Sequence, residues 1–471
     1  MGNDLWTWTG ADLASAIRTR QVSSREALES CLARVDQVNP RINAIVDLLA
    51  DEARDGADLA DQAVKKGELL APLHGVPITI KINVDYAGRA TTNGSAALKH
   101  LIAKEDSVPV VNLKKAGAVI FGRTNVPALS TRYFTDNELY GRTLNPWDAS
   151  RTPGGSSGGA AAAVATGMGP VGHGNDRAGS IRYPAYACGV VGLRPSLGRV
   201  PDMNPTAPID RTIGSQMANM QGPLARTVGD IRLTLAALSL RDARDPWWVP
   251  APLDFVPAPE NKRVALVKSL PEVDVDPAVS NAVAEAGKWL EQAGYVVEET
   301  PPPRFLEAAK MFWTLLMTEE RAFAPGQSPM ELYGDTPAKR ARASQKAYAR
   351  QYDFNEYILA LARRTTILRE WQQFFERYPL ILLPVSWQKP LPIDEDQKGE
   401  EAMRRVLIAH SPLIAISILG LPGLSVPTGL ADGVPMGVQL VAARYQEERC
   451  LKAGEAIEKL RPKFSIPIDP R

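Results

Sequence analysis

Two serines and one lysine are the residues of this chain whose types and surroundings could cleave an amide. Ser156 lies in the run Gly154-Gly155-Ser156-Ser157-Gly158-Gly159, and Ser180 closes the run Ala178-Gly179-Ser180. Lys81 precedes both, directly after the mostly apolar run 76–80. A serine is a weak nucleophile until a base removes its proton, and a second hydroxyl together with a neutral amine can do so. This chemistry would need none of the four histidines.

The lysine must be buried to act as a base. An exposed lysine has a pKa of about 10.4, so it is protonated and cannot accept a proton at neutral pH. Burial disfavours the charged form and lowers the pKa. The neighbours Ile80 and Ile82 are apolar and favour a buried position for Lys81.

The segments around these residues resemble the amidase signature family of serine hydrolases, which use a Ser–Ser–Lys triad. The run 145–148, Asn-Pro-Trp-Asp, leads into the glycine–serine run as it does in family members. A glycine–serine run alone would be weak evidence, because flexible linkers share that composition. The resemblance covers roughly residues 5 to 460 and is loosest between about 300 and 380. Its other segments are 182–185, 192–198, 222–230, 420–427 and 433–439.

The resemblance implies a role for each residue of the set. Ser180 matches the nucleophile that forms an acyl-enzyme, Ser156 the bridging serine held by a cis peptide after Gly155, and Lys81 the base. It also implies that backbone N–H groups at Arg177, Ala178, Gly179 and Ser180 stabilise the oxyanion. Losing one such donor typically costs about 10²–10³ in rate.

Three residues depart from the family pattern. Ile82 follows the base where an aspartate is usual, Ala178 replaces a glycine, and Arg177 stands where a smaller residue is common. Alanine keeps its N–H, so the oxyanion contact survives unless position 178 requires a positive φ. The triad is untouched, and the shape of the acyl site stays open.

Other polar residues near the two serines have competing interpretations. His173 could pair with a serine, but no acidic residue that would orient it is identifiable. Arg182 could bind a substrate carboxylate, although a buried structural ion pair is favoured. Asp176 is interpreted as a hydrogen-bond acceptor that holds the loop.

Composition is typical of a globular enzyme without cofactor. The 471 residues are 45% hydrophobic and 23% charged, which excludes a disordered chain. Lys plus Arg (54) nearly equals Asp plus Glu (53), so no basic excess suggests nucleic-acid binding. The first residues lack a secretory signal, and the stretch 409–427 is predicted as strand and loop rather than a membrane span. Three separated cysteines, Cys31, Cys188 and Cys450, predict buried thiols in the cytoplasm and no metal site.

Alternating helix and strand patterns predict an α/β fold. Helices are expected within 11–37 (two, the second capped by Ser23 and Glu26), 52–68, 107–116, 160–166 and 277–293. Strands are expected at 76–82, 118–122, 263–267 and 295–298. Such alternation predicts a mainly parallel or mixed sheet covered on both faces. The resemblance implies the same large twisted sheet in one domain, residues 1–471.

The segment from about 300 to 380 is predicted to be helical and to carry substrate specificity. Apolar residues at helical spacing, Ile358, Leu361, Leu368, Trp371 and Phe375, indicate a core-facing stripe. The predicted wall of the substrate pocket consists of Phe312, Trp313 and Met317 from this segment, with Tyr133 and Phe134 from an earlier loop.

These observations predict an amidohydrolase that cleaves a small or medium hydrophobic or aryl amide, with esters and carbamates as further candidates. A homodimer is one possible assembly, and neither nucleic acid nor membrane is expected as a partner. Two alternatives stay open. One is the glutaminase subunit of a tRNA-dependent amidotransferase, and the other is a non-catalytic ligand-binding module.

Overall fold

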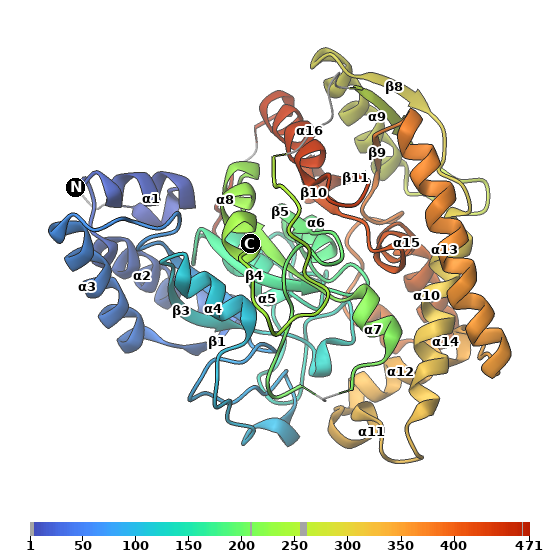
Figure 1. The fold of residues 1–471 in the computed structure, drawn as a ribbon, viewed down its shortest axis with the longest axis horizontal. Coiled ribbons are helices and arrows are strands. Elements are labelled where there is room, and N and C mark those ends of the chain that lie inside the picture. Colours follow the sequence, from blue (N-terminus) through green and yellow to red (C-terminus); the bar gives the residue numbers. More distant parts are fainter. Residues whose placement is uncertain (1–3, 208–209, 255–260, 464) are drawn as a thin grey trace.

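A single mixed sheet forms the centre of the molecule (Figure 1). The computed structural model describes residues 4–207, 210–254, 261–463 and 465–471. Within them the strand order is β1-β3-β2-β4-β6-β5-β10-β11-β9-β7-β8, eleven strands in all. The strands are β1 Ile45–Leu48, β2 Pro77–Lys81, β3 Val119–Thr124, β4 Val171–Asp176, β5 Val191–Arg194, β6 Met220–Ala225, β7 Arg263–Leu266, β8 Val296–Glu299, β9 Leu380–Pro384, β10 Gly423–Ala431 and β11 Val434–Ala442.

Strand pairing confirms the predicted mixed sheet. Strand β2 pairs in parallel with both β3 and β4, whereas β4 pairs antiparallel with β6. Strands β5 and β11 flank β10, both antiparallel to it. Lys81 at the end of β2 and Asp176 at the end of β4 are thus carried by neighbouring parallel strands, so residues following both strands meet at one edge of the sheet.

Both faces of the sheet are buried, and alternate side chains enter different cores. In β9, Leu380 and Leu382 pack into one hydrophobic cluster, while Ile381 and Leu383 pack into the other. Such two-sided burial needs helices on both faces. The α-helices are α1 Gly10–Arg18, α2 Ser24–Ile42, α3 Ala50–Lys66, α4 Val108–Lys115, α5 Gly158–Ala165, α6 Arg182–Cys188, α7 Ile213–Ala218, α8 Val228–Leu238, α9 Pro277–Gln292, α10 Phe305–Glu319, α11 Pro329–Tyr333, α12 Thr336–Tyr348, α13 Phe354–Arg377, α14 Glu400–Ala409, α15 Ser411–Leu419 and α16 Glu447–Leu460.

The clearest sequence signals correspond to observed elements. Helix α2 begins with the predicted capping box, in which Ser23 accepts from the Glu26 N–H and the Glu26 side chain accepts from the Ser23 N–H. The expected helices and strands before residue 300 all appear, within a few residues of the predicted bounds. Local capping and periodicity are therefore good guides in this part of the chain.

The prediction of strand and loop for 409–427 is wrong in its first half, which is helix α15. Pro412 lies in the first turn of the helix, where its missing N–H has no intrahelical partner to lose. Gly420 ends the helix in the left-handed conformation. Residues taken as breakers are thus its start and stop signals. Among the described residues, no single helix is long and apolar enough to cross a membrane; α14 and α15 reach that length only together, with a bend of 64°.

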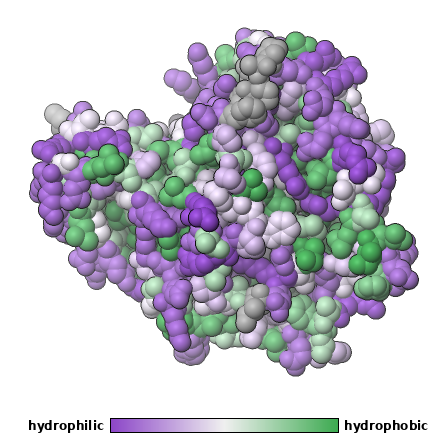
Figure 2. Space-filling model, in the orientation of Figure 1, coloured by the Kyte–Doolittle hydropathy of each residue, from purple (hydrophilic) through white to green (hydrophobic). Residues whose placement is uncertain are grey.

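The core-facing stripe predicted for helix α13 is only partly correct. Trp371 and Phe375 are buried as expected, but Ile358 is 47% exposed. Together with exposed Phe354 and Leu359, it belongs to the first turns of the helix. Figure 2 shows hydrophobic atoms gathered at the right edge of the view, where Figure 1 draws the lower end of α13. The buried face begins only at Ala360.

Candidate active site

Lys81 is fully buried at the end of β2 and contacts the bridging-serine position directly. Its Nζ lies 2.7 Å from Ser156 Oγ and 2.6 Å from Asn175 Oδ1. Burial lowers the pKa of the amine well below its ordinary value; Asp176 opposes this shift and the charge of Arg177 adds to it. The hydrogen bond to Ser156 places the amine where it can exchange a proton with that hydroxyl.

The Ser156 loop packs tightly against a second loop. The Gly155–Ser156 peptide is cis, as the resemblance implies. A side chain at position 155 would collide with the backbone of residues 132–134, since its Cβ would lie 2.5 Å from the Arg132 carbonyl oxygen. The Ser157 N–H donates to the Ser180 carbonyl oxygen at 3.1 Å, which joins the two serine-bearing loops.

A buried carboxylate organises the loop that carries Ser180. Asp176 accepts from the N–H groups of Gly179 (2.7 Å) and Ile181 (3.2 Å), and it forms ion pairs with Arg182 (2.9 Å) and Arg194 (3.4 Å). Burial would raise the pKa of Asp176, but the two guanidinium groups hold it below its usual range. Both interpretations made for Asp176 and Arg182 are confirmed: the first holds the loop, and the second is a structural ion-pair partner. Ser180 itself is 8% exposed, whereas Lys81 is not exposed at all.

The predicted oxyanion donors differ in availability. The Gly179 N–H is engaged by Asp176, so the expectation that it donates to an oxyanion needs correction. Gly179 is instead required for its φ of +113°, and a Cβ there would meet Leu413. Ala178 does not adopt a positive φ, which removes the objection to alanine at this position. In the described part of the chain, the N–H groups of Arg177, Ala178 and Ser180 have no acceptor.

His173 lies on β4 and is not placed to serve as the base. Its Nε2 pairs with Gln221 Oε1 at 2.9 Å, and its Nδ1 is 3.5 Å from the Lys81 backbone nitrogen. Burial lowers the pKa of His173 to about 4. It therefore supports the backbone of the lysine strand.

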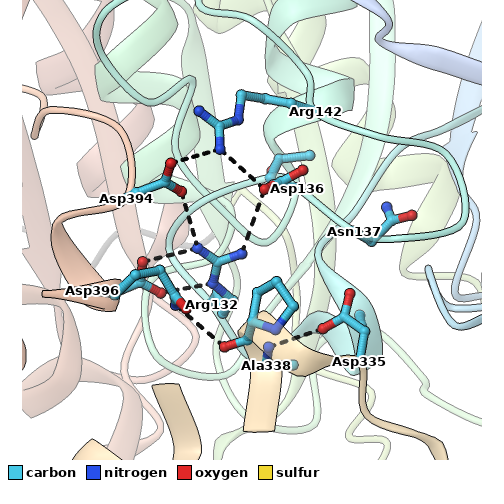
Figure 3. Close-up of polar contacts among 12 residues, drawn as sticks. Arg132, Asp136, Asn137, Arg142, Asp335, Ala338, Asp394 and Asp396 are labelled. Atoms are coloured by element: carbon cyan, nitrogen blue, oxygen red, sulfur yellow. Dashed lines mark hydrogen bonds and ion pairs between the residues drawn. The ribbon is translucent and has the colours of Figure 1, made fainter. Parts of the chain in front are cut away.

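An ion-pair network holds the loop 132–142, which carries Tyr133 (Figure 3). Arg132 forms a bidentate pair with Asp396, at 2.7 and 2.9 Å, while Arg142 contacts both Asp136 and Asp394. In Figure 3 these side chains converge from the loop 132–142 and the segment 394–396. Paired, hydrogen-bonded charges of this kind restrict a loop to one arrangement.

Tyr133, next to Arg132, connects this network to the Ser180 loop. Its hydroxyl donates to the Ala178 carbonyl oxygen at 2.8 Å, and its ring stacks on His410 with centroids 4.0 Å apart. The hydrogen bond helps to fix the peptide between Ala178 and Gly179. The tyrosine thus holds the loop as well as bordering the pocket.

A cavity of about 330 Å³ opens onto Ser156 and Ser180, and a narrower one of about 30 Å³ adjoins it. Of the five predicted pocket residues, Tyr133, Phe312 and Trp313 line the narrower cavity. The other two expectations are wrong: neither Phe134 nor Met317 lines either cavity, and both are buried in the core. Phe134 lines a separate small cavity, and the Met317 sulfur contacts Arg342 instead.

The sequence interpretation missed the polar part of this cavity. Asn175, one residue before Asp176, contacts both Lys81 and Asn83. Half of the residues that the segment 316–345 contributes to the cavity wall are also polar. Nothing in the local pattern marks these residues, because helix periodicity separates buried from exposed positions and does not reveal a ligand-facing side. The polar wall residues of that segment are Glu319, Glu320, Arg342 and Gln345.

Known proteins resemble the chain along nearly its whole length. The Amidase family model matches residues 26–451. An indoleacetamide hydrolase of Bradyrhizobium diazoefficiens is 44% identical over 96% of this chain and 86% of its own. One subunit of the glutamyl-tRNA(Gln) amidotransferase of Moorella thermoacetica is 33% identical, covering 97% of both chains. The solved structure of a bacterial aryl acylamidase of the amidase signature family superimposes with a TM-score of 0.81, at 27% identity and over 96% of both chains.

The chain therefore belongs to the amidase family. It is a hydrolase that cleaves amide C–N bonds, and the Ser–Ser–Lys triad is characteristic of its family.

Proposed function

We propose that Ser180 is the nucleophile, Ser156 the proton relay and Lys81 the base of a hydrolase acting on aryl or other hydrophobic amides. The observation that carries this assignment is the 2.7 Å contact between Lys81 Nζ and Ser156 Oγ in a fully buried site. Burial lowers the pKa of the amine and so favours the neutral form, which can take a proton from a hydroxyl. Next to this pair, Ser180 borders the cavity.

The proton moves in two coupled steps. Lys81 takes the Ser156 proton as Ser156 takes the Ser180 proton, and Ser180 Oγ attacks the amide carbon. The tetrahedral oxyanion accepts hydrogen bonds from the N–H groups of Arg177, Ala178 and Ser180. The same relay in reverse gives the proton to the departing amine as the C–N bond breaks. Water then gives a proton to the relay as it attacks the acyl carbon, and the relay returns that proton to Ser180 Oγ as the acid leaves.

The aromatic lining of the narrower cavity favours an aryl group on the substrate. Tyr133, Phe312 and Trp313 provide flat apolar surfaces beside Ser180, and Phe312 and Trp313 pack edge to face. The relatives named for indoleacetamide and aryl acyl amides support the same substrate class.

The decisive experiment combines covalent labelling with a substrate panel. A sulfonyl fluoride should add one mass increment, mapped to Ser180, and Ser180→Ala should abolish it. Indoleacetamide, an anilide, a carbamate and glutamine should then be compared by kcat/KM, with and without EDTA. An aryl amide cleaved orders of magnitude faster than glutamine, and no loss with EDTA, is the expected result. Labelling at Ser156 or Ser157 would overturn the assignment.

The glutaminase alternative stays in the panel because amidotransferase subunits occur among the relatives. Comparable rates for glutamine and an anilide, or glutaminase activity only with a partner protein, would favour it. A folded protein without turnover of any amide would favour the non-catalytic ligand-binding module. We also propose that residues 1–471 form one domain, in which the segment 300–380 carries specificity. The protein is proposed to be a cytoplasmic homodimer that needs no cofactor and binds neither nucleic acid nor membrane. Size measurements in solution test the assembly.

A further inference from the structure

Arg342 is a buried cation with incomplete compensation at the wall of the substrate cavity. It is 8% exposed and lines both cavities beside Ser180. Its Nη1 contacts the Met317 sulfur at 3.8 Å, and its Nε, 3.9 Å from Glu320, is buried without a hydrogen-bond partner. A buried guanidinium normally has carboxylate or carbonyl partners, because desolvating its charge is costly.

Arg177 lines the same two cavities and belongs to the loop that leads to Ser180. Its polar contact is a long one, 3.4 Å from Nη1 to Ser215 Oγ. Among the described residues, it forms no ion pair with a carboxylate. Burial, followed by the charge of Arg342, lowers the pKa of Arg177 to about 10, so the two guanidinium groups repel each other. An anion placed between the two guanidinium groups would relieve this repulsion and accept hydrogen bonds from their N–H donors.

The nearby carboxylates do not satisfy these cations directly. Glu319 Oε1 accepts from the Gly214 N–H and the Tyr357 hydroxyl, each at 2.7 Å. Glu320 lies 3.6 Å from Lys346, closer than its 3.9 Å approach to Arg342. With Asp202 and Asp210, these carboxylates offset the positive charge of the cavity. The anion site therefore depends on guanidinium N–H donors that no carboxylate of the described residues approaches closer than 3.9 Å.

We propose that Arg177 and Arg342 bind a carboxylate on the substrate, remote from the scissile amide, and so select anionic aryl amides. A carboxylate presents two acceptor oxygens, which match the paired N–H donors of a guanidinium. The aromatic surfaces of Tyr133, Phe312 and Trp313 adjoin both arginines, so one substrate can satisfy both parts of the wall. This inference rests on the proposed aryl-amide hydrolysis and specifies its substrate class.

Matched substrates test the proposal without changing the protein. Carboxyphenylacetamide and nitrophenylacetamide, each as the meta and para isomer, have the same shape and differ in charge. The carboxylated amide should have a kcat/KM about tenfold higher or more, mostly through a lower KM, since the remote carboxylate is bound equally in ground and transition states. Equal or better turnover of both nitro isomers would overturn the proposal.

Variants then assign the selectivity to the two arginines. Arg342→Met removes the charge and keeps the contact with Met317, and it should bring the carboxylate-to-nitro ratio close to one. Arg342→Lys should retain part of the preference, and Arg404→Gln, an exposed change on α14, should leave the ratio unchanged. Equal losses for both substrates in Arg342→Met would contradict a charge-reading role. Arg177→Gln provides a second variant in case Arg342→Met does not fold.

The outcomes separate this inference from the proposed function. Ser180-dependent cleavage of the nitro amide without carboxylate preference overturns the inference alone. Cleavage of neither amide by folded protein overturns the proposed aryl-amide function. Calorimetry gives a readout that does not depend on turnover. It compares the binding of carboxyphenylacetamide to Ser180→Ala with its binding to the double variant Ser180→Ala/Arg342→Met.

Discussion

The polar groups of the proposed catalytic set and those of the cavity wall are held in opposite ways. The floor consists of Lys81, Ser156, Ser180 and the supporting Asp176, and the wall consists of the lining residues between 312 and 345. On the floor, Asp176 accepts from two backbone N–H groups and pairs with two arginines, and Lys81 contacts both Ser156 and Asn175. On the wall, several buried polar atoms have no hydrogen-bond partner among the described residues. They belong to Trp313, Glu319, Glu320, Arg342 and Gln345.

This difference separates chemistry from recognition. A group that must transfer protons requires a fixed position before the substrate arrives, and hydrogen bonds such as those of Lys81 and Asp176 supply it. A group that recognises a ligand has to keep its donors or acceptors available, at a cost in stability. Substitutions in the floor are therefore expected to lower the catalytic rate or the folding stability. Substitutions in the wall are expected to change the substrate preference.

The largest expected effect concerns the catalytic set on the floor. Ser180→Ala and Lys81→Ala should each lower kcat/KM by about 10⁴-fold or more with folding retained, and Ser156→Ala by a similar or somewhat smaller factor. The double variant Lys81→Ala/Ser156→Ala should be little worse than either single one, because the two act as one relay. Steady-state kinetics with Lys66→Ala, an exposed lysine of α3, as the control checks this. Multiplicative losses would show independent roles, and near-normal turnover by Lys81→Ala would return His173 to consideration.

The next effect is on stability. Asp176→Asn keeps the shape but leaves Arg182 and Arg194 without their buried counter-charge, and it should cost about 3–5 kcal/mol of unfolding free energy. Denaturant titration measures the loss. The matched control Asp148→Asn breaks a partly exposed pair with Arg151, 3.3 Å apart, and should cost about 1 kcal/mol or less. A loss below that of the control would refute the organising role of Asp176.

The pH profile should report the neutral base. Because burial lowers the pKa of Lys81, the deprotonated, active form already predominates below the ordinary lysine range. On the acid side, kcat/KM should rise about tenfold per pH unit up to one ionisation well below pH 10.4, and then level. A profile that keeps rising to the ordinary lysine pKa would mean an unperturbed amine.

The smallest effect on activity is expected at Tyr133, which contacts the Ser180 loop and also lines the narrower cavity. Tyr133→Phe removes the hydroxyl that donates to the Ala178 carbonyl and retains the ring. The lost hydrogen bond is worth about 1 kcal/mol, so kcat should fall about fivefold, with KM for an aryl amide little changed. The control is Tyr333→Phe, a partly exposed tyrosine of α11. A change in KM alone would place Tyr133 purely in recognition.

Local sequence signals predicted much of the floor and little of the wall. Lys81 at a strand end, the glycine-rich runs and the Ser23–Glu26 cap are all encoded within a few residues, where propensity and capping act. Helix α15 was missed because Pro412 and Gly420 can end or begin a helix, and composition alone does not say which. The contacts of Asn175 with Lys81, and of Arg342 with the cavity, depend on residues far apart in sequence. No periodicity carries such information.

The connections of Arg182 have a consequence for how the protein is made. Its guanidinium bonds to Ser417 and Gln439, which are separated from it by 235 and 257 residues. The three residues of the proposed triad leave the ribosome long before these partners do, and β5 finds its neighbour β10 equally late. Such non-local pairing slows folding. The nascent chain thus carries a complete set of reactive groups without the scaffold that orients them, and hydrolytic competence arises only once the last strands have been synthesised.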